Sequence, residues 1–264
     1  MRFVTLLWLL CFSLQGQART FEHQPLTQLL QQTVHALPGG HATAVNYRLL
    51  QQQQAQLEAY LTSLSAVEMS TFKQWPTAER LAFLLNAYNA WTLQLILTAY
   101  PNLDSIKDLG TLFQSPWKKR FIPLLGQHRS LDEIEHEMIR GSGDFNEPRI
   151  HFAVNCASIG CPALREEAYN AATLEQQLEQ QTVRFLSDRS RNLATDERLQ
   201  LSAIFKWYKE DFQQPWRDSR SLASFLLRYA QALQLDERQQ QQLAAGKLPI
   251  SFLDYDWRLN AVAQ

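Results

Sequence analysis

The sequence predicts an α+β fold, a helix-dominated single domain in which a central buried helix packs on a small sheet. Three observations indicate this class. Residues 79–100 are apolar on nearly every side of a helical repeat. The segments that favour strands are few and short, at 149–156, 198–202 and 250–257. No internal repeat and no Gly-, Pro- or Ser-rich linker divides the 264-residue chain, so we expect one globular domain.

The N-terminus has the pattern of a bacterial signal peptide. Arg2 precedes an apolar run of roughly ten residues, and Gly16 and Ala18 are small residues at the two positions that a signal peptidase reads. The run is too short for a transmembrane helix, which needs about 20 residues, and no later segment is long and apolar enough to span a bilayer. We therefore expect residues 1–18 to be removed and residues 19–264 to form a periplasmic or secreted domain without a transmembrane segment.

The composition excludes several classes of protein. Apolar residues make up 45% of the chain and charged residues 19%, which suffices for a hydrophobic core and is not typical of disorder. The net charge of −1 gives no electrostatic footprint for nucleic acid or for an anionic membrane. We expect a small-molecule or peptide substrate as the partner, and no nucleic acid.

The first two predicted helical segments differ in the polarity of their faces. Residues 47–64 repeat leucine and tyrosine at helical spacing, and their outer face is rich in glutamine. Residues 79–100 form the predicted central helix, in which Asn86, Asn89 and Thr92 recur every three residues as one polar stripe. A buried amide without a partner costs roughly 1–3 kcal/mol, so the stripe must face hydrogen-bonding groups. It either holds the fold together or forms one wall of a site.

A capping box made by Ser130 and Glu133 begins the next predicted helix, at residues 130–140. At about 100° per residue, Glu135 falls in the middle of the apolar face and His136 falls on its rim. A carboxylate directed at a core costs several kcal/mol unless it is paired or protonated, so we predict that Glu135 is buried beside a donor. The candidate donors are a histidine, Arg149, and the amides of Asn86 and Asn89.

Short elements are predicted for the second half of the chain. Residues 149–156 favour a buried strand, with His151 and Asn155 on the face opposite to Cys156, and residues 157–162 form a turn. The other predicted elements are a helix at 173–186, a strand at 198–202, helices at 203–212 and 222–233, a helix that Gly246 ends, and a strand at 250–257.

Two cysteines, Cys156 and Cys161, remain after removal of the signal peptide. In an oxidising compartment such an even pair can form a disulfide. The same spacing suits a reactive thiol with a neighbour, or two ligands of a metal site that would also need two of His128, His136 and His151. Nothing fixes these histidines at ligand spacing, and we predict no metal and no cofactor.

Cys156 ends a predicted strand immediately before a turn, where functional side chains are often presented. A thiol of ordinary pKa, about 8.5, is only a few per cent ionised at neutral pH, so a nucleophilic cysteine needs a base. His136 is the preferred base because Glu135 lies next to it and could orient the imidazole. An odd separation along a strand directs His151 away from Cys156. A buried inert thiol is the alternative for Cys156.

Five sequence motifs are distributed between residues 81 and 257. They are LAFLLNAYNAW (81–91), SLDEIEH (130–136), HFAVNCASIGCP (151–162), IFKWY (204–208) and YDW (255–257). In this order they resemble the motifs of the domain of unknown function 547 family, over roughly residue 45 to the C-terminus. In the plant-type branch of that family the position of Cys161 is often not cysteine, whereas that of Cys156 usually is. The resemblance therefore favours chemistry at Cys156 over an obligatory disulfide. It also implies that the following residues lie on family motifs: Asn86, Asn89, Glu135, His136, Cys156, Ser158 and Pro162.

The leading hypothesis from the sequence is a periplasmic cysteine-dependent hydrolase or acyltransferase acting on a small peptide or thiol compound. Cys156 would be the nucleophile and His136 the base, with Glu135 orienting the imidazole. The remaining candidate residues would bind substrate or donate amides to a developing oxyanion, and they are Asn86, Asn89, Asn155, His151 and Ser158. Two alternatives stay open: a non-catalytic binding module for a small molecule or peptide, and a structural protein with a Cys156–Cys161 disulfide.

Overall fold

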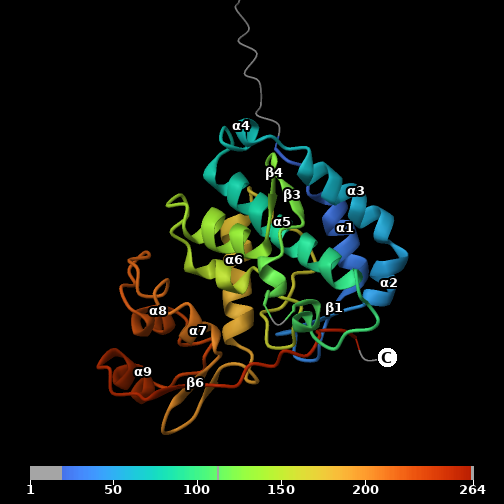
Figure 1. Cartoon of the computed structure of the whole chain (residues 1–264). Coiled ribbons are helices and arrows are strands. Elements are labelled where there is room, and N and C mark those ends of the chain that lie inside the picture. Colours follow the sequence, from blue (N-terminus) through green and yellow to red (C-terminus); the bar gives the residue numbers. More distant parts are fainter. Residues whose placement is uncertain (1–19, 112, 263–264) are drawn as a thin grey trace, which may run out of the picture.

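The structure is a computed structural model that describes residues 20–111 and 113–262. The predicted signal peptide, residues 1–18, lies outside the described residues. Helices form most of the described part, and its strands are confined to small sheets (Figure 1). The predicted helix-dominated α+β class is confirmed.

The central helix α5 (Thr77–Leu97) is buried along almost its whole length. Because it is apolar on nearly every side, other elements can cover all of its faces. The helix α3 (Gln54–Ser65) and the π-helix η3 (Glu133–Arg140) both pack against it. The predicted helix at 47–64 is divided at Gln53 into two helices. The other helices of this half are α1 (Gln24–Thr33), α2 (Tyr47–Gln52) and α4 (Met69–Phe72).

Three small sheets are present in the described part of the chain. Two are antiparallel hairpins, and in the third β6 pairs antiparallel with β5 and parallel with β7. The strands are β1 (Val34–Ala36), β2 (Thr43–Val45), β3 (Ile122–Leu124), β4 (Gln127–Arg129), β5 (Leu193–Ala194), β6 (Leu199–Leu201) and β7 (Ile250–Phe252). After β7 the chain crosses the base of the molecule towards β1 (Figure 1) and forms bridges from Leu259 to Ser158 and from Ala261 to Val45.

The second half contains short helices, several of which are shorter than predicted. The predicted helix at 173–186 is confirmed as α6 (Leu174–Leu186). Only the first turn of the predicted helix at 203–212 is helical, as α7 (Ile204–Trp207), and the segment then continues in turns. The remaining helices of the described residues, two of which precede this half, are η1 (Ile106–Leu109), η2 (Pro116–Lys118), η4 (Pro148–Phe152), α8 (Leu222–Arg228) and α9 (Glu237–Ala244).

The predicted strand at 149–156 is wrong, because this segment begins as the 3₁₀-helix η4 and ends in an irregular loop. Pro148 occupies the first turn, where its missing N–H costs nothing, and the Glu147 side chain accepts a hydrogen bond from the Arg149 N–H (3.1 Å). All five residues of η4 are buried. The segment therefore has no exposed polar face whose spacing would separate the two-residue repeat of a strand from the three-residue repeat of a 3₁₀-helix. An alternation of apolar residues therefore could not separate a strand from a tight helix here.

Two hydrophobic clusters form the core. The larger one surrounds α5, and the smaller one is aromatic and surrounds Phe152, Phe205 and Phe225. The wall of one cavity contains Tyr88 from the first cluster and Ile204 from the second, so this cavity lies where the two clusters meet.

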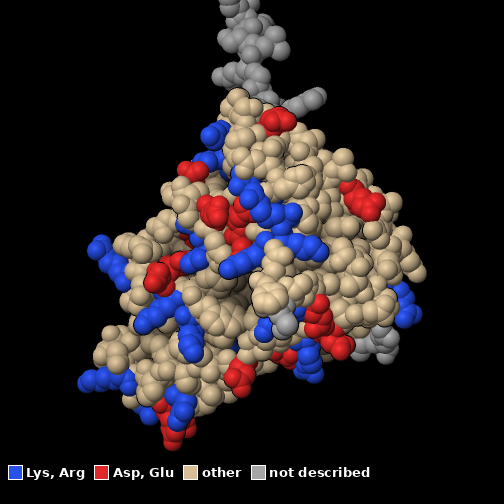
Figure 2. Space-filling model, in the orientation of Figure 1, with Lys and Arg blue, Asp and Glu red and all other residues tan. Residues whose placement is uncertain are grey.

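No helix among the residues described combines the length and the apolar character that a membrane span requires. On the face drawn in Figure 2, the basic and acidic side chains of the described residues are interspersed.

Candidate functional site

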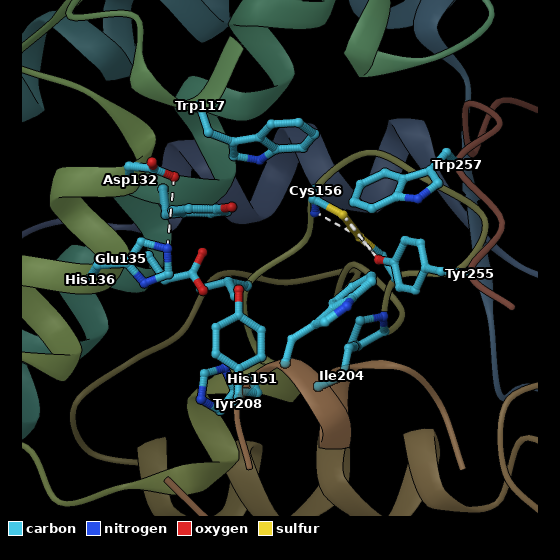
Figure 3. A pocket seen from close by; sticks show the side chains of 15 residues that line it. Trp117, Asp132, Glu135, His136, His151, Cys156, Ile204, Tyr208, Tyr255 and Trp257 are labelled. Carbon is cyan, nitrogen blue, oxygen red and sulfur yellow. Dashed lines mark hydrogen bonds and ion pairs between the residues drawn. A yellow bond between two sulfur atoms is a disulfide. The ribbon is translucent and has the colours of Figure 1, made fainter. Parts of the chain in front are cut away.

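A cavity of about 170 Å³ opens between the two clusters. Polar and acidic side chains from η3 and η4 lie in its wall together with the loop that carries Cys156 (Figure 3). The rest of the wall is rich in aromatic rings, which are Tyr88, Trp117, Trp207, Tyr208, Tyr255 and Trp257. Such a concave apolar site with a few converging polar groups is typical of small-ligand binding.

Cys156 and Cys161 are joined by a disulfide in the cavity wall. The Cys156 Sγ also lies 3.3 Å from Ser158 Oγ and 3.1 Å from Tyr255 Oη. Ser158 is buried, and it therefore reaches the sulfur from within the fold. The disulfide that the sequence left open is thus present, and a nucleophilic role for Cys156 requires its reduction.

The C-terminal segment positions the cysteine loop. The Ile159 N–H donates to Arg258 O and the Gly160 N–H to Asp256 O, both at 2.8 Å. Glycine is required at position 160, because a Cβ there would lie 2.9 Å from Tyr255 Cε1 and 3.0 Å from the Asp256 backbone. This close approach places the Tyr255 ring beside the disulfide.

The polar stripe of α5 holds the fold together. Asn86 exchanges two hydrogen bonds with the Tyr169 backbone, both at 2.8 Å. Asn89 donates to Ala153 O (3.0 Å) and accepts from the Asn155 N–H (2.9 Å). Of the two readings of the stripe, the structural one therefore fits the geometry. Asn89 fixes the chain immediately before Cys156.

Asn155 is also used within the loop. Its amide donates to Pro162 O (2.8 Å) and accepts from the Ala157 N–H (2.9 Å). Asn86, Asn89 and Asn155 are absent from the lining of the cavity. Their amides are engaged by backbone groups, so they are not free to act as the oxyanion donors that the sequence suggested.

Glu135 is buried as predicted, with 5% of its surface exposed. The predicted partner is not found: its Oε1 has no hydrogen-bond partner in the described part of the structure. Arg149 pairs with other glutamates, and the amides of the α5 stripe bond the backbone. The phenols of Tyr88 and Tyr208 flank the carboxylate instead. Burial, followed by the charge of Glu135, raises the pKa of both phenols well above the ordinary value of 10.0.

His136 lies on the same side of the cavity as Glu135, whereas Cys156 and Tyr255 lie on the other side (Figure 3). Its Nδ1 is 2.9 Å from Arg140 Nη1, and its Nε2 is 3.8 Å from an Asp132 oxygen. Arginine can only donate, so Nδ1 accepts and Nε2 carries the proton. The structure gives neither His136 nor His151 a hydrogen bond to Cys156 among the described residues.

His151 also lines the cavity, together with Cys156. The predicted strand would have directed its side chain away from Cys156. Its Nε2 is 2.7 Å from Asp211 Oδ2, and its ring stacks on Tyr208 at 3.9 Å between centroids. Burial lowers the pKa of His151 below its ordinary 6.5, and the Asp211 hydrogen bond only partly opposes this. Burial alone would raise the pKa of Asp211, but hydrogen bonds from His151 and Arg140 hold it well below its ordinary value. His151 is therefore a neutral imidazole whose Nε2–H donates to an ionised carboxylate.

Sequence reasoning missed several residues of the site. Asp211 lies outside every motif that was assigned a role, and Asp132, which lies within the motif at 130–136, was given no role. The aromatic lining could have been found from the motifs at 204–208 and 255–257, whose tryptophans and tyrosines are dense. Both motifs contribute to the family resemblance, which assigns them no functional role. No group of three or more potential metal ligands is found among the described residues.

A comparison with protein families supports the predicted resemblance over part of the chain. Residues 72–186 match the family described as "Protein of unknown function, DUF547". This segment includes Glu135, His151 and both cysteines, whereas Asp211 and Tyr255 lie beyond it. Searches among curated proteins and among solved structures found no match.

Proposed function

We propose that this chain is an exported cysteine-dependent hydrolase or acyltransferase with a small-molecule or peptide substrate, and that Cys156 is its nucleophile. The observation that carries the proposal is the common cavity. Cys156 lies in its wall with His151, whose Nδ1 has no partner among the described residues while its Nε2 is bonded to Asp211. An imidazole oriented by a carboxylate and carrying a free lone pair suits a general base.

Hydrogen bonding favours His151 over His136 as the base. The Nδ1 lone pair of His136 accepts a hydrogen bond from Arg140, and its Nε2 bears the proton. Neither nitrogen is therefore free to take a proton from Cys156. His151 has the same tautomer, because Asp211 fixes the proton on Nε2, but its Nδ1 lone pair has no partner among the described residues. His136 and Glu135 then belong to substrate binding.

The catalytic form requires reduction of the disulfide. A dithiol supplies two electrons and two protons, becomes a disulfide itself, and leaves Cys156 and Cys161 as thiols. The hydroxyls of Ser158 and Tyr255, which lie 3.3 and 3.1 Å from the Cys156 sulfur, can then donate to its thiolate and stabilise it.

The reaction proceeds in two balanced steps. In the first, the Cys156 S–H proton moves to His151 Nδ1, the sulfur bonds to the substrate carbonyl carbon, and the leaving group departs with that proton. In the second, water or an acceptor amine attacks the thioester. His151 takes the proton of the incoming nucleophile and returns it to the Cys156 sulfur as the thioester breaks.

The paired cysteine variants test this proposal. The wild type is reduced with dithiothreitol and desalted, and hydrolysis of p-nitrophenyl esters is compared with that of the oxidised protein. Cys161→Ser leaves Cys156 without its disulfide partner, so this variant should be active without prior reduction. Cys156→Ser should lose at least about 100-fold in kcat/KM in every state.

The two variants remove the same disulfide, so each controls for the stability that it contributes. Equal activity of Cys156→Ser and Cys161→Ser would reject Cys156 as the nucleophile. It would also favour a purely structural disulfide.

A further inference from the structure

One carboxylate in the cavity has no counter-charge. Glu135 is 5% exposed, lines the cavity and makes no ion pair within the described residues, and its Oε1 accepts no hydrogen bond there. Burying an ionised carboxylate without a counter-charge is strongly unfavourable, so such a group in a binding cavity indicates a missing cation.

The Arg140 cation, whose charge interacts with Glu135, is already engaged. The Arg140 guanidinium makes two hydrogen bonds to Asp211, at 2.6 and 2.9 Å, and a third to His136. Lys107 Nζ lies 3.8 Å from the centroid of the Trp257 ring, and that ring is across the cavity from Glu135 (Figure 3). Asp132 adds a second carboxylate to the wall. The protonated phenols of Tyr88 and Tyr208 flank Glu135 but bring no charge.

The aromatic walls suit a cation. Tyrosine and tryptophan faces attract ammonium and guanidinium groups, more strongly where water is excluded. Six such side chains surround a cavity of about 170 Å³, which fits a small head group. The buried Glu135 Oε1 has no hydrogen-bond partner among the described residues and can accept an N–H donor. A primary ammonium or a guanidinium has such donors, and a quaternary ammonium lacks them.

We infer that the cavity binds a primary ammonium or guanidinium group of its substrate, with Glu135 as the carboxylate that accepts the N–H groups. That the bound group belongs to a substrate rests on the proposed function. Binding itself does not depend on Cys156 chemistry. It assigns Glu135 to substrate recognition, and it makes an amine-bearing acyl compound or a basic peptide the expected substrate class.

Calorimetric titration of the oxidised protein tests this inference, because the disulfide prevents turnover. We expect n-butylammonium to bind at least tenfold more tightly than n-butanol, its neutral counterpart, and more tightly than tetramethylammonium. Glu135→Gln, which keeps the shape of the side chain, should weaken n-butylammonium binding at least tenfold. Glu137→Gln, an exposed neighbour on the same helix, should leave it unchanged.

Several outcomes would overturn the inference. They are equal binding of n-butylammonium and n-butanol, unchanged affinity in Glu135→Gln, and no binding of n-butylammonium at millimolar concentration. The comparison of charged and neutral probes uses the wild type alone, so it holds even where Glu135→Gln does not fold. Unchanged activity in Cys156→Ser would reject the hydrolase proposal. If the protein still bound amines selectively, the assignment of Glu135 to ammonium binding would stand.

Discussion

Replacing Arg149 with methionine is expected to lower the free energy of unfolding by about 3 kcal/mol. The guanidinium is fully buried and donates to Glu147 (2.6 and 2.8 Å), Glu175 (2.7 and 3.0 Å) and Glu179 (3.0 Å). Methionine keeps much of the volume but leaves Glu147 and Glu179 without a cation, and Glu175 with Arg217 alone. The value lies at the low end of the usual 3–5 kcal/mol for breaking a buried pair, since Glu175 and Glu179 keep contact with water. Urea denaturation at pH 7 under non-reducing conditions measures it.

Arg217→Met is the matched control. Arg217 also pairs with Glu175, and like Arg149 it lies over the Trp216 ring, but a third of its side chain is exposed. Its loss should change the free energy of unfolding by less than about 1 kcal/mol. If Arg149→Met and Arg217→Met lowered the free energy of unfolding equally, burial of Arg149 would not be the cause of its larger contribution.

Acid should reduce the difference between wild type and Arg149→Met. Hydrogen bonds from Arg149 outweigh burial and hold the pKa of Glu175 at about 2, below its ordinary 4.5. A carboxyl whose pKa is depressed in the fold stabilises it above the unfolded pKa, and this contribution is lost as the pH falls through the folded pKa. The difference should be full above pH 4.5 and shrink towards pH 2.

Replacing His151 with alanine is expected to lower kcat of the reduced enzyme by about 10²–10⁴-fold, the range for loss of a general base. The imidazole is stacked on Tyr208 and bonded to Asp211, so a melting curve must accompany the kinetics. Esterase turnover by the folded fraction is the measured quantity. Asp211→Asn should reproduce part of the loss, because the amide no longer fixes the proton on His151 Nε2.

His136→Ala is the control for this assignment. It removes an imidazole from the same cavity, but one whose Nδ1 is held by Arg140, and it should alter KM more than kcat. The acid limb of the kcat/KM profile should fall below pH 6.5, since burial lowers the pKa of His151. A larger loss of kcat in His136→Ala than in His151→Ala would restore His136 as the base.

The parts of the fold that could be predicted from sequence are those with an amphipathic or fully apolar pattern. α5 and α6 were found this way, and burial of Glu135 followed from its place among apolar neighbours. η3 is a π-helix and not the α-helix that the prediction assumed. Its buried face nevertheless contains both Ile134 and Glu135. Local periodicity suffices where one face of an element must meet the core.

The parts that could not be predicted depend on long-range contacts. The position of His151 follows from the 3₁₀-helix η4, which a fully buried segment does not reveal in its pattern. Its partner Asp211 is 60 residues away, and the partner Tyr255 of Cys156 is 99 residues away. No spacing in the sequence encodes such pairs, so the base was assigned to the histidine nearest an acid along the chain.

Trapping of the acyl-enzyme tests the central claim most directly. Reduced wild-type protein is mixed with p-nitrophenyl acetate, quenched in acid, digested and mapped by mass spectrometry. The account predicts one acetyl group, bound to Cys156, removed by hydroxylamine, and absent from the oxidised protein and from protein reduced and denatured before mixing. Acetylation spread over lysines, or equal labelling of Cys161, would contradict it.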